Sequence, residues 1–340
     1  MILIKDPKVS VIMACHNAAP FINLAIDSVI NQTFYDLELI IVDDASSDDS
    51  LSIMKRASNK DSRIKIVSLA SNVGAAAARN IAIKKAKGEW LAILDADDIF
   101  LTNKIESQLG LLTLTPHNSN AVLIGANSFE IDEKGNRLSL QRYYFCCKTV
   151  KKNLVQLKRF PPHSSLMYKT DVVQSLGGFN PRCYRSEDYD LWLRLLQYGS
   201  FLLDSNPLVE YRHHGSNISK TNFGFEQIKY SIAIATCHFI REEGFPDPSK
   251  DYSIDEWNSF LSWIFIHVEK AGLLEYSRER ERWLDLIQKR KYFLYKSLTL
   301  LSLVIINFNF FCKVVEKKIF GERLPRRLSN KWINKIKKHL

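Results

Sequence analysis

Strand-like and helix-like segments alternate along the first part of this chain, and this alternation constrains the fold more than any other feature. Four short apolar runs have the length and composition of buried strands: 9–14, 37–42, 64–69 and 90–94. Between them lie three stretches with apolar residues at helical spacing: 21–31, 49–57 and 75–86. Such alternation predicts an α/β fold in which helices cover both faces of a mostly parallel sheet. The chain has 340 residues, of which 46% are apolar, which is enough for a large core.

Polar residues follow each of the four predicted strands. They are Cys15-His16-Asn17, Asp43-Asp44, Ser71-Asn72 and Asp95-Ala96-Asp97-Asp98. In a parallel sheet the carboxyl ends of the strands lie along one edge, and open α/β folds bind their ligands at that edge. We therefore expect these four groups to share one edge of the sheet, where a ligand would bind.

Three carboxylates, Asp95, Asp97 and Asp98, end the fourth strand. Carboxylates this close repel one another unless a cation, a proton or a polar ligand offsets their charge. The sequence has no GxGxxG or GxxxxGKS/T phosphate loop, so a divalent ion that binds a diphosphate, Mg²⁺ or Mn²⁺, is the expected cofactor. Alternation places Asp98 on the opposite side from the other two, where it is expected to cap a helix that begins near Thr102.

The alternation ends near residue 220, where we expect a domain boundary. Before it, residues 121–129 and a turn at Lys134-Gly135 predict an antiparallel hairpin, and residues 187–196 predict a short helix. After it, the apolar spacing predicts helices only: 225–241, 257–270 and 277–291. The sequence thus predicts an α/β domain over residues 1–220 and a helical region over residues 221–340.

The net charge of +10 is concentrated at the C-terminal end. Residues 289–340 carry 14 basic and 2 acidic side chains, interleaved with apolar residues. Within them, the uncharged stretch 297–312 is short for a membrane span, which takes roughly 20 residues. This pattern favours binding of the tail to an anionic membrane surface, with a solvated basic tail as the alternative. A nucleic-acid partner would account for the tail but not for the carboxylates, so we expect no nucleic acid.

Neither the N-terminus nor the cysteines indicate export. Only four apolar residues precede Lys5, which is too few for the core of a secretory signal. The six cysteines include no CxxC pair, and a core of this size does not depend on disulfides. We therefore expect a cytoplasmic protein with reduced thiols.

Five segments between Val9 and Ser219 carry a resemblance to a known family: VSVIMACHN, LELIIVDDASSDDS, NVGAAAARNIAIKKAKGEWLAILDADD, GGFNPRCYRSEDYDLWLRL and YRHHGSNIS. In these segments the chain resembles the family 2 glycosyltransferases, which have the GT-A fold. The resemblance implies inverting transfer of a sugar from a nucleotide donor, a UDP-sugar, to an acceptor hydroxyl. No QxxRW follows the helix at 187–196, which favours addition of one sugar over processive polymerisation. Bacterial members of this kind extend lipid-linked or lipopolysaccharide glycans, which implies a peripheral position on the cytoplasmic face of the inner membrane.

The resemblance also implies a set of residues that bind the nucleotide: Ala14, His16, Asn17, Asp44, Arg79 and Asp95. Asp44 would accept a hydrogen bond from N3–H of uracil, and Asp95 would contact the ribose. His16 stands where the family usually has an aromatic residue, and Ala14 lacks a hydroxyl. For Arg79, whose guanidinium suits a phosphate or a base, the alternative is a surface ion pair.

By the same resemblance, Asp97 and His214 are the expected ligands of the Mn²⁺ or Mg²⁺ ion. The ion would stabilise negative charge on the departing nucleoside diphosphate. For His214 the alternative is a structural role in the loop.

The pair Glu187-Asp188 matches the ED signature of the family, so the resemblance makes Asp188 the general base. Acidic residues also favour the first turn of a helix, and the two roles are compatible. Glu187 and Trp192 are the expected acceptor-binding residues. Trp192 shares a helical face with Asp188 and would stack on a sugar, with a place in the core as the alternative. Another class of function, a sugar-nucleotide-binding scaffold without catalysis, is disfavoured by the presence of Asp97 and Asp188.

Overall fold

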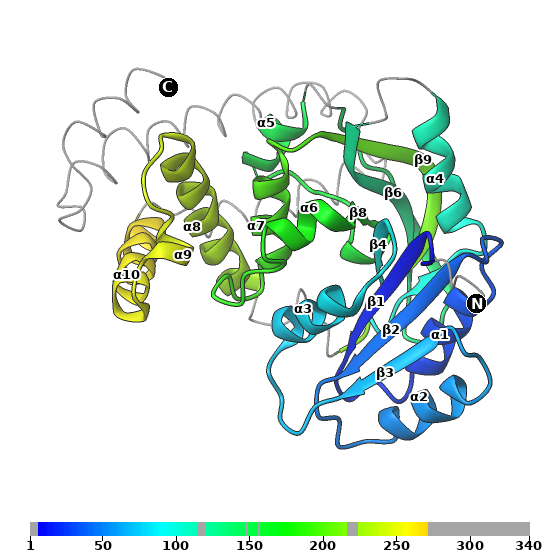
Figure 1. Cartoon of the computed structure of the whole chain (residues 1–340). Helices are drawn as coiled ribbons and strands as arrows, with labels where there is room; N and C mark the ends of the chain where they lie inside the picture. The colour runs from blue at the N-terminus through cyan, green and yellow to red at the C-terminus, as the bar shows by residue number, and fades with distance from the viewer. Residues whose placement is uncertain (1–5, 115–119, 147–148, 156, 216–223, 271–340) are drawn as a thin grey trace. The chain divides into compact units, whose positions relative to one another are not determined.

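A computed structural model describes residues 6–114, 120–146, 149–155, 157–215 and 224–270 (Figure 1). The chain divides into two compact units, Met1–Thr221 and Asn222–Leu340. The division falls beside the boundary expected near residue 220. The predicted helix at 277–291 and the basic tail lie outside the described residues.

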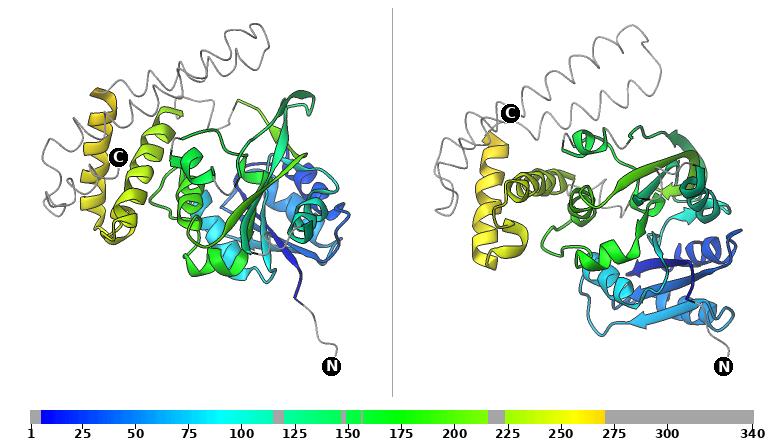
Figure 2. Two further views of the ribbon diagram at one scale, coloured as in Figure 1. Left: turned by 90° about the horizontal axis from the view of Figure 1, so that it is seen from above. Right: turned by 45° about the horizontal axis from the view of Figure 1, so that its top comes forward.

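Four parallel strands form the first half of the sheet in the first unit. They are β1 (Val9–Cys15), β2 (Leu37–Asp43), β3 (Ile64–Ser68) and β4 (Trp90–Ile93), in the spatial order β3-β2-β1-β4. The helices that connect them are α1 (Ile22–Ile30), α2 (Ser50–Ser58) and α3 (Ala75–Lys85). Every residue of β2 is buried, because helices cover both faces of this half (Figure 2). The predicted strand and helix alternation is therefore confirmed.

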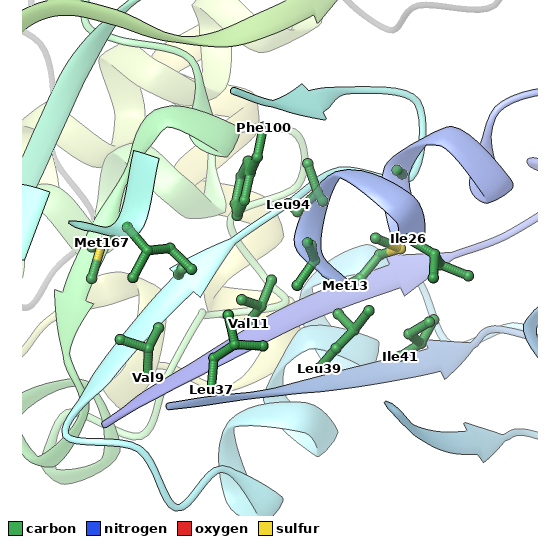
Figure 3. Close-up of a cluster of buried hydrophobic side chains, with 14 of the residues drawn as sticks. Val9, Val11, Met13, Ile26, Leu37, Leu39, Ile41, Leu94, Phe100 and Met167 are labelled. Atoms are coloured by element: carbon green, nitrogen blue, oxygen red, sulfur yellow. The ribbon is translucent and has the colours of Figure 1, made fainter. Parts of the chain in front are cut away.

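Alternate residues of β1 and β2 form the core beneath α1 (Figure 3). The side chains on this face are at most 4% exposed: Val9, Val11 and Met13 on β1, and Leu37, Leu39 and Ile41 on β2. They pack against Ile26 and its neighbours on α1. Burying each large apolar side chain is worth about 1.5–3 kcal/mol. This core holds the carboxyl ends of β1 and β2, where the polar loops begin.

The second half of the sheet is mixed. β8 (Met167–Lys169) pairs antiparallel with β4, and β6 (Ala121–Ile131) pairs antiparallel with β8. β9 (Ser200–Arg212) runs parallel to β6, and β5 (Ile99–Phe100) lies at the edge beyond it. The predicted hairpin is confirmed, since β7 (Arg137–Gln141) returns along β6 after a turn in which Gly135 has a φ of 91°. The α/β fold class is confirmed as a whole.

β9 was not predicted, and it matters most for the site. The run Asp204–Pro207 has the composition of a turn, yet it continues through the strand with register shifts against β6. Because β9 is 13 residues long, it carries Arg212, His213 and His214 to the end of β4.

Shorter elements complete the first unit. The predicted helix at 187–196 is α7 (Glu187–Leu195), and the helix after β5 is α4 (Lys104–Leu114). β5 and β8 were not predicted either, nor were three further elements: α5 (Val150–Val155), the 3-10 turn η2 (His163–Ser165) and α6 (Thr170–Ser175).

The described part of the second unit is helical, as predicted. It contains α8 (Gly224–Glu242), α9 (Pro248–Asp251) and α10 (Ile254–Lys270), which contact one another. Asp247 caps α9, because its carboxylate accepts the N–H of Ser249 at 2.9 Å. None of the helices in the described ranges is both long enough and apolar enough to span a bilayer.

Candidate active site

The loops that follow β1 and β2 are held together by hydrogen bonds. His16 Nδ1 lies 2.8 Å from the carbonyl oxygen of Asp44, and Asn17 Oδ1 accepts the N–H of Ser47 at 2.8 Å. Asn17 has a φ of 53°, a conformation that asparagine tolerates better than most residues. His16 and Asn17 are exposed and Ala14 is half-buried at the end of β1. The structure thus brings these three residues and Asp44 to one edge.

Asp44 anchors the helix that follows the third strand. Its carboxylate accepts the N–H groups of Val73 and Gly74 at 2.7 and 2.9 Å, directly before α3. Asp44 is only 3% exposed. The neighbouring Asp43 shapes the turn by accepting the N–H of Ser46 at 3.3 Å. The recognition of uracil by Asp44 stays a prediction, and the structure adds that this carboxylate orients α3.

Arg79 on α3 joins two acidic segments. Its guanidinium binds Asp95 at 2.7 Å and Glu187 at 3.1 Å, and it is 11% exposed. Burial opposes ionisation of Asp95, but the favourable interactions, of which the charge of Arg79 is the largest, together outweigh burial and lower the pKa of Asp95. The ion pair expected as an alternative for Arg79 is present, and it is largely buried inside the candidate site rather than on the surface.

Asp97 and His214 lie side by side. The Nε2 atom of His214 is 2.8 Å from Oδ2 of Asp97. Burial and the nearby Asp95 charge raise the pKa of Asp97, as expected for a carboxylate crowded by another. Among the described residues no group of three or more His, Cys, Asp or Glu side chains is arranged to hold a metal ion. A carboxylate and an imidazole nevertheless suit Mn²⁺ or Mg²⁺, because such ions bind through few protein groups when phosphate and water complete the shell.

The prediction for Asp98 was wrong. Asp98 does not cap a helix, since α4 begins only at Lys104. Instead its carboxylate is buried and accepts the hydroxyl of Ser164 at 2.5 Å and the backbone N–H of Arg212 at 2.8 Å. Burial and the charges of Asp97 and Asp95 raise the pKa of Asp98 well above its usual value. Asp98 thus ties the end of β4 to η2 and β9.

The turn η2 contributes two residues that the sequence analysis missed. Ser164 Oγ accepts the N–H of Asp95 at 3.1 Å while it donates to Asp98, so it holds both ends of the acidic loop. His163 lies beside it, edge-on to the rings of Tyr168 and Phe179. Burial, followed by the charge of Arg79, lowers the pKa of His163 to about 3, so this imidazole is neutral. The run Pro161–Ser165 was the only signal in the sequence, and nothing in it indicates contact with a loop 69 positions away.

Asp188 lies in the first turn of α7 beside Glu187. Its Oδ1 accepts the N–H of Tyr189 at 2.6 Å. Burial and the Glu187 carboxylate raise the pKa of Asp188 to about 7. Its expected role as a helix-start residue and its expected role as a base are therefore compatible in this geometry. Glu187 itself pairs with Arg79, so its side chain is engaged within the protein.

A glycine turn positions α7 relative to α3. Asn80, next to Arg79, bonds both backbone groups of Phe179, at 2.7 and 2.8 Å. Gly178 has a φ of 74°, and a Cβ there would lie 2.2 Å from Oδ1 of Asn80. Only glycine fits this close approach.

Trp192 lies in the core and not on an accessible sugar-binding surface. It is 7% exposed, its Nε1–H donates to the hydroxyl of Tyr168 at 2.8 Å, and its ring packs on Phe160 at 4.4 Å. The core position was the alternative for this residue, and the structure favours it because the indole already has both its polar and its apolar partners.

Residues 10–177 match the family model described as Glycosyl transferase family 2. The O-antigen biosynthesis glycosyltransferase WbnJ of Escherichia coli is 33% identical over 236 residues, which are 66% of this chain and 87% of that protein. Among solved structures, S. aureus TarS 1-349 in complex with UDP-GlcNAc has a TM-score of 0.55 at 17% identity, over 80% of this chain and 87% of that one. Mannosyltransferase PcManGT from Pyrobaculum calidifontis, in complex with GDP-Man and Mn²⁺, has a TM-score of 0.53 at 14% identity, over 94% and 89%. These likenesses confirm the expected GT-A fold.

Proposed function

The chain belongs to glycosyl transferase family 2, and we propose that it transfers one sugar, with inversion, from a UDP-sugar to a hydroxyl of a glycan or lipid-linked acceptor. The observation that carries this proposal is the Arg79 bridge. It joins Asp95, on the donor side, to the helix start that presents Asp188. A single displacement needs a bound donor and a proton acceptor within one site, and this bridge brings the two together.

The donor would bind over the loops that follow β1 and β2. Asp44 would accept a hydrogen bond from N3–H of uracil, since a carboxylate has about four acceptor positions and the described residues Val73 and Gly74 occupy two of them. His16 and Asn17 are exposed beside it, and Asp95 would contact the ribose. The complex of TarS with UDP-GlcNAc supports a UDP-sugar as the donor.

Asp97 and His214 would hold Mn²⁺ or Mg²⁺. When bound, the ion would supply Lewis-acid stabilisation of the charge on the departing diphosphate. Two observations support this assignment: the 2.8 Å separation of the two side chains and the Mn²⁺ in the PcManGT complex.

Asp188 would accept the proton of the attacking hydroxyl. Its pKa of about 7 lies near neutral pH. At that pH a substantial fraction of the carboxylate is ionised and still binds a proton strongly enough to act as a base. Arg79 would keep Glu187 away from this role by pairing with it. Attack from the acceptor side opposite the leaving diphosphate would invert the anomeric centre.

The acceptor would be a precursor of a surface polysaccharide, as the name of the E. coli relative WbnJ suggests. Such precursors would place the enzyme at the cytoplasmic face of the inner membrane, with the basic tail binding anionic lipid. The tail lies outside the described residues.

A panel of nucleotide sugars tests the proposal without knowledge of the acceptor. We expect slow hydrolysis of one UDP-sugar that requires Mn²⁺ or Mg²⁺, stops with EDTA and falls at least about tenfold in Asp97→Asn. Asp171→Asn, an exposed carboxylate of α6, is the matched control and should hydrolyse the donor as the wild type does. Absence of both hydrolysis and calorimetric UDP binding would refute the proposal. UDP binding without hydrolysis or transfer would instead favour the scaffold alternative.

A further inference from the structure

A cavity of about 620 Å³ lies away from the donor-binding residues. The segment that follows β7 supplies most of its lining: Arg142, Tyr143, Tyr144, Phe145 and Cys146. Asn127 of β6 contributes an amide. None of the residues assigned above to the nucleotide, the metal or the base lines this cavity. The cavity therefore requires an explanation of its own.

Aromatic contacts connect the cavity to the helix that carries the base. Phe145 stacks on Phe160 with centroids 4.9 Å apart, and Phe160 packs on Trp192 at 4.4 Å. Trp192 lies one helical turn after Asp188. Helix α5, which follows the lining segment, also contacts α7 (Figure 1), and the Tyr189 hydroxyl donates to one of its backbone carbonyls at 2.9 Å. The segment that lines the cavity is therefore packed, through Phe160 and α5, against the helix that carries the proposed base.

The lining residues have the chemistry of a site for an anionic sugar. Tyr144 is 79% exposed, and a solvent-exposed aromatic ring offers a stacking surface for a sugar ring. Arg142 is exposed and makes no ion pair with any residue that the structure describes. None of the described lining residues is acidic. The Arg142 guanidinium is thus available for a carboxylate or a phosphate, which it can bind through two N–H groups.

We propose that this cavity binds the acceptor glycan, through a sugar ring stacked on Tyr144 and an anionic substituent paired with Arg142. The proposal rests on the proposed function, because only a transferase needs an acceptor. Because Asp188 does not line the cavity, the sugar bound there is a different residue of the acceptor from the one that Asp188 deprotonates. The acceptor is therefore an anionic oligosaccharide of at least two sugars.

Cys146 allows a direct test, because its thiol is exposed at the cavity. The other cysteines that the structure describes are buried: Cys15, Cys183 and Cys237. In the full chain with Cys147→Ser and Cys312→Ser, which lie outside the described residues, the rate of alkylation by N-ethylmaleimide reports access to Cys146. The probes are a tetrasaccharide of alternating glucuronic acid and N-acetylglucosamine, pentamannose 6-phosphate, and neutral chitotetraose.

We expect at least one anionic probe to slow alkylation about fivefold at a concentration where chitotetraose has little effect. Arg142→Gln and Tyr144→Ala should each remove most of this protection, and both side chains are exposed, so neither change should disturb folding. Arg56→Gln and Tyr35→Ala alter exposed residues elsewhere and should leave the protection intact. The two anionic arms tell whether the cavity prefers a carboxylate or a phosphate.

Two results would overturn the proposal: no protection by any probe, or protection by chitotetraose as strong as that by the anionic probes. Metal-dependent donor hydrolysis, measured on the same protein, separates this failure from failure of the proposed function. Hydrolysis without protection removes the cavity assignment alone. Protection without hydrolysis or UDP binding removes the transferase and leaves a protein that binds anionic sugars.

Discussion

At the scale of single residues, burial sets the protonation of the proposed base. With the pKa of Asp188 raised to about 7, mainly by burial and then by Glu187, the carboxylate is half ionised near neutrality. Asp188→Asn should lower kcat by about 10²- to 10⁴-fold and leave UDP affinity within about twofold. In the wild type, kcat/KM should rise with pH up to about 7, because the base acts only when ionised. Asp171→Asn is the control, and transfer by Asp188→Asn at the wild-type rate would exclude Asp188 as the base.

A second residue-scale prediction concerns Lys104, which is fully buried and hydrogen-bonds Gln108 at 2.7 Å. Burial lowers the pKa of Lys104 from 10.5 to about 7. At pH values between these two pKa values the unfolded chain binds up to one more proton than the folded chain, so this lysine makes the free energy of unfolding rise by up to about 1.4 kcal/mol per pH unit.

Lys104→Met removes this dependence. Measured by urea unfolding, the free energy of unfolding of the wild type should rise relative to that of Lys104→Met as the pH increases from 7 to 9. Lys84→Met, an exposed lysine on α3, should show no such trend. A constant difference for Lys104→Met would mean that the buried amine stays charged.

At the scale of elements, the short turn η2 holds the acidic loop of β4 through Ser164. Ser164→Ala removes the acceptor of the Asp95 N–H and the donor to Asp98, and should lower the free energy of unfolding by about 1–3 kcal/mol. It should also weaken Mn²⁺-dependent UDP binding, since Asp97 lies within the released loop. Ser165→Ala is a matched control, because its buried hydroxyl donates to the carbonyl of Pro162 and to no other residue in the described ranges. Equal losses of UDP affinity in both variants would contradict this role of Ser164.

At the scale of the whole molecule, the first unit contains the sheet, its core and every residue proposed for the donor site. We expect a chain that ends at Thr221 to unfold cooperatively and to bind UDP with Mn²⁺ within about threefold of the full chain's affinity. It should lose binding to anionic vesicles, because the basic tail is removed. Binding to neutral vesicles is the control for both chains. Vesicle binding that survives truncation would assign the membrane contact to the first unit.

The spacing of apolar residues along the chain was enough to predict the buried strands and the amphipathic helix. The strands at 9–14 and 37–42 and the helix at 187–196 are present within one residue at each end, because burial on both faces and helical spacing leave periodic marks. β9 escaped prediction because Asp204–Pro207 resemble a turn, and tertiary pairing with β6 overrides that preference. The segments His163–Ser165 and Val150–Val155 are too short to show a period.

By itself the sequence determined which polar residues follow the strands of the parallel half. It therefore also determined that Asp44, Asp95 and Asp97 share one edge of the sheet. Only the tertiary structure decided which of them touch. Arg79 reaches Glu187 across 108 positions and His214 reaches Asp97 across 117, while Asp98 turns inward to Ser164 and Trp192 enters the core. These contacts depend on how distant segments pack, and packing leaves no periodic mark in the sequence around either partner.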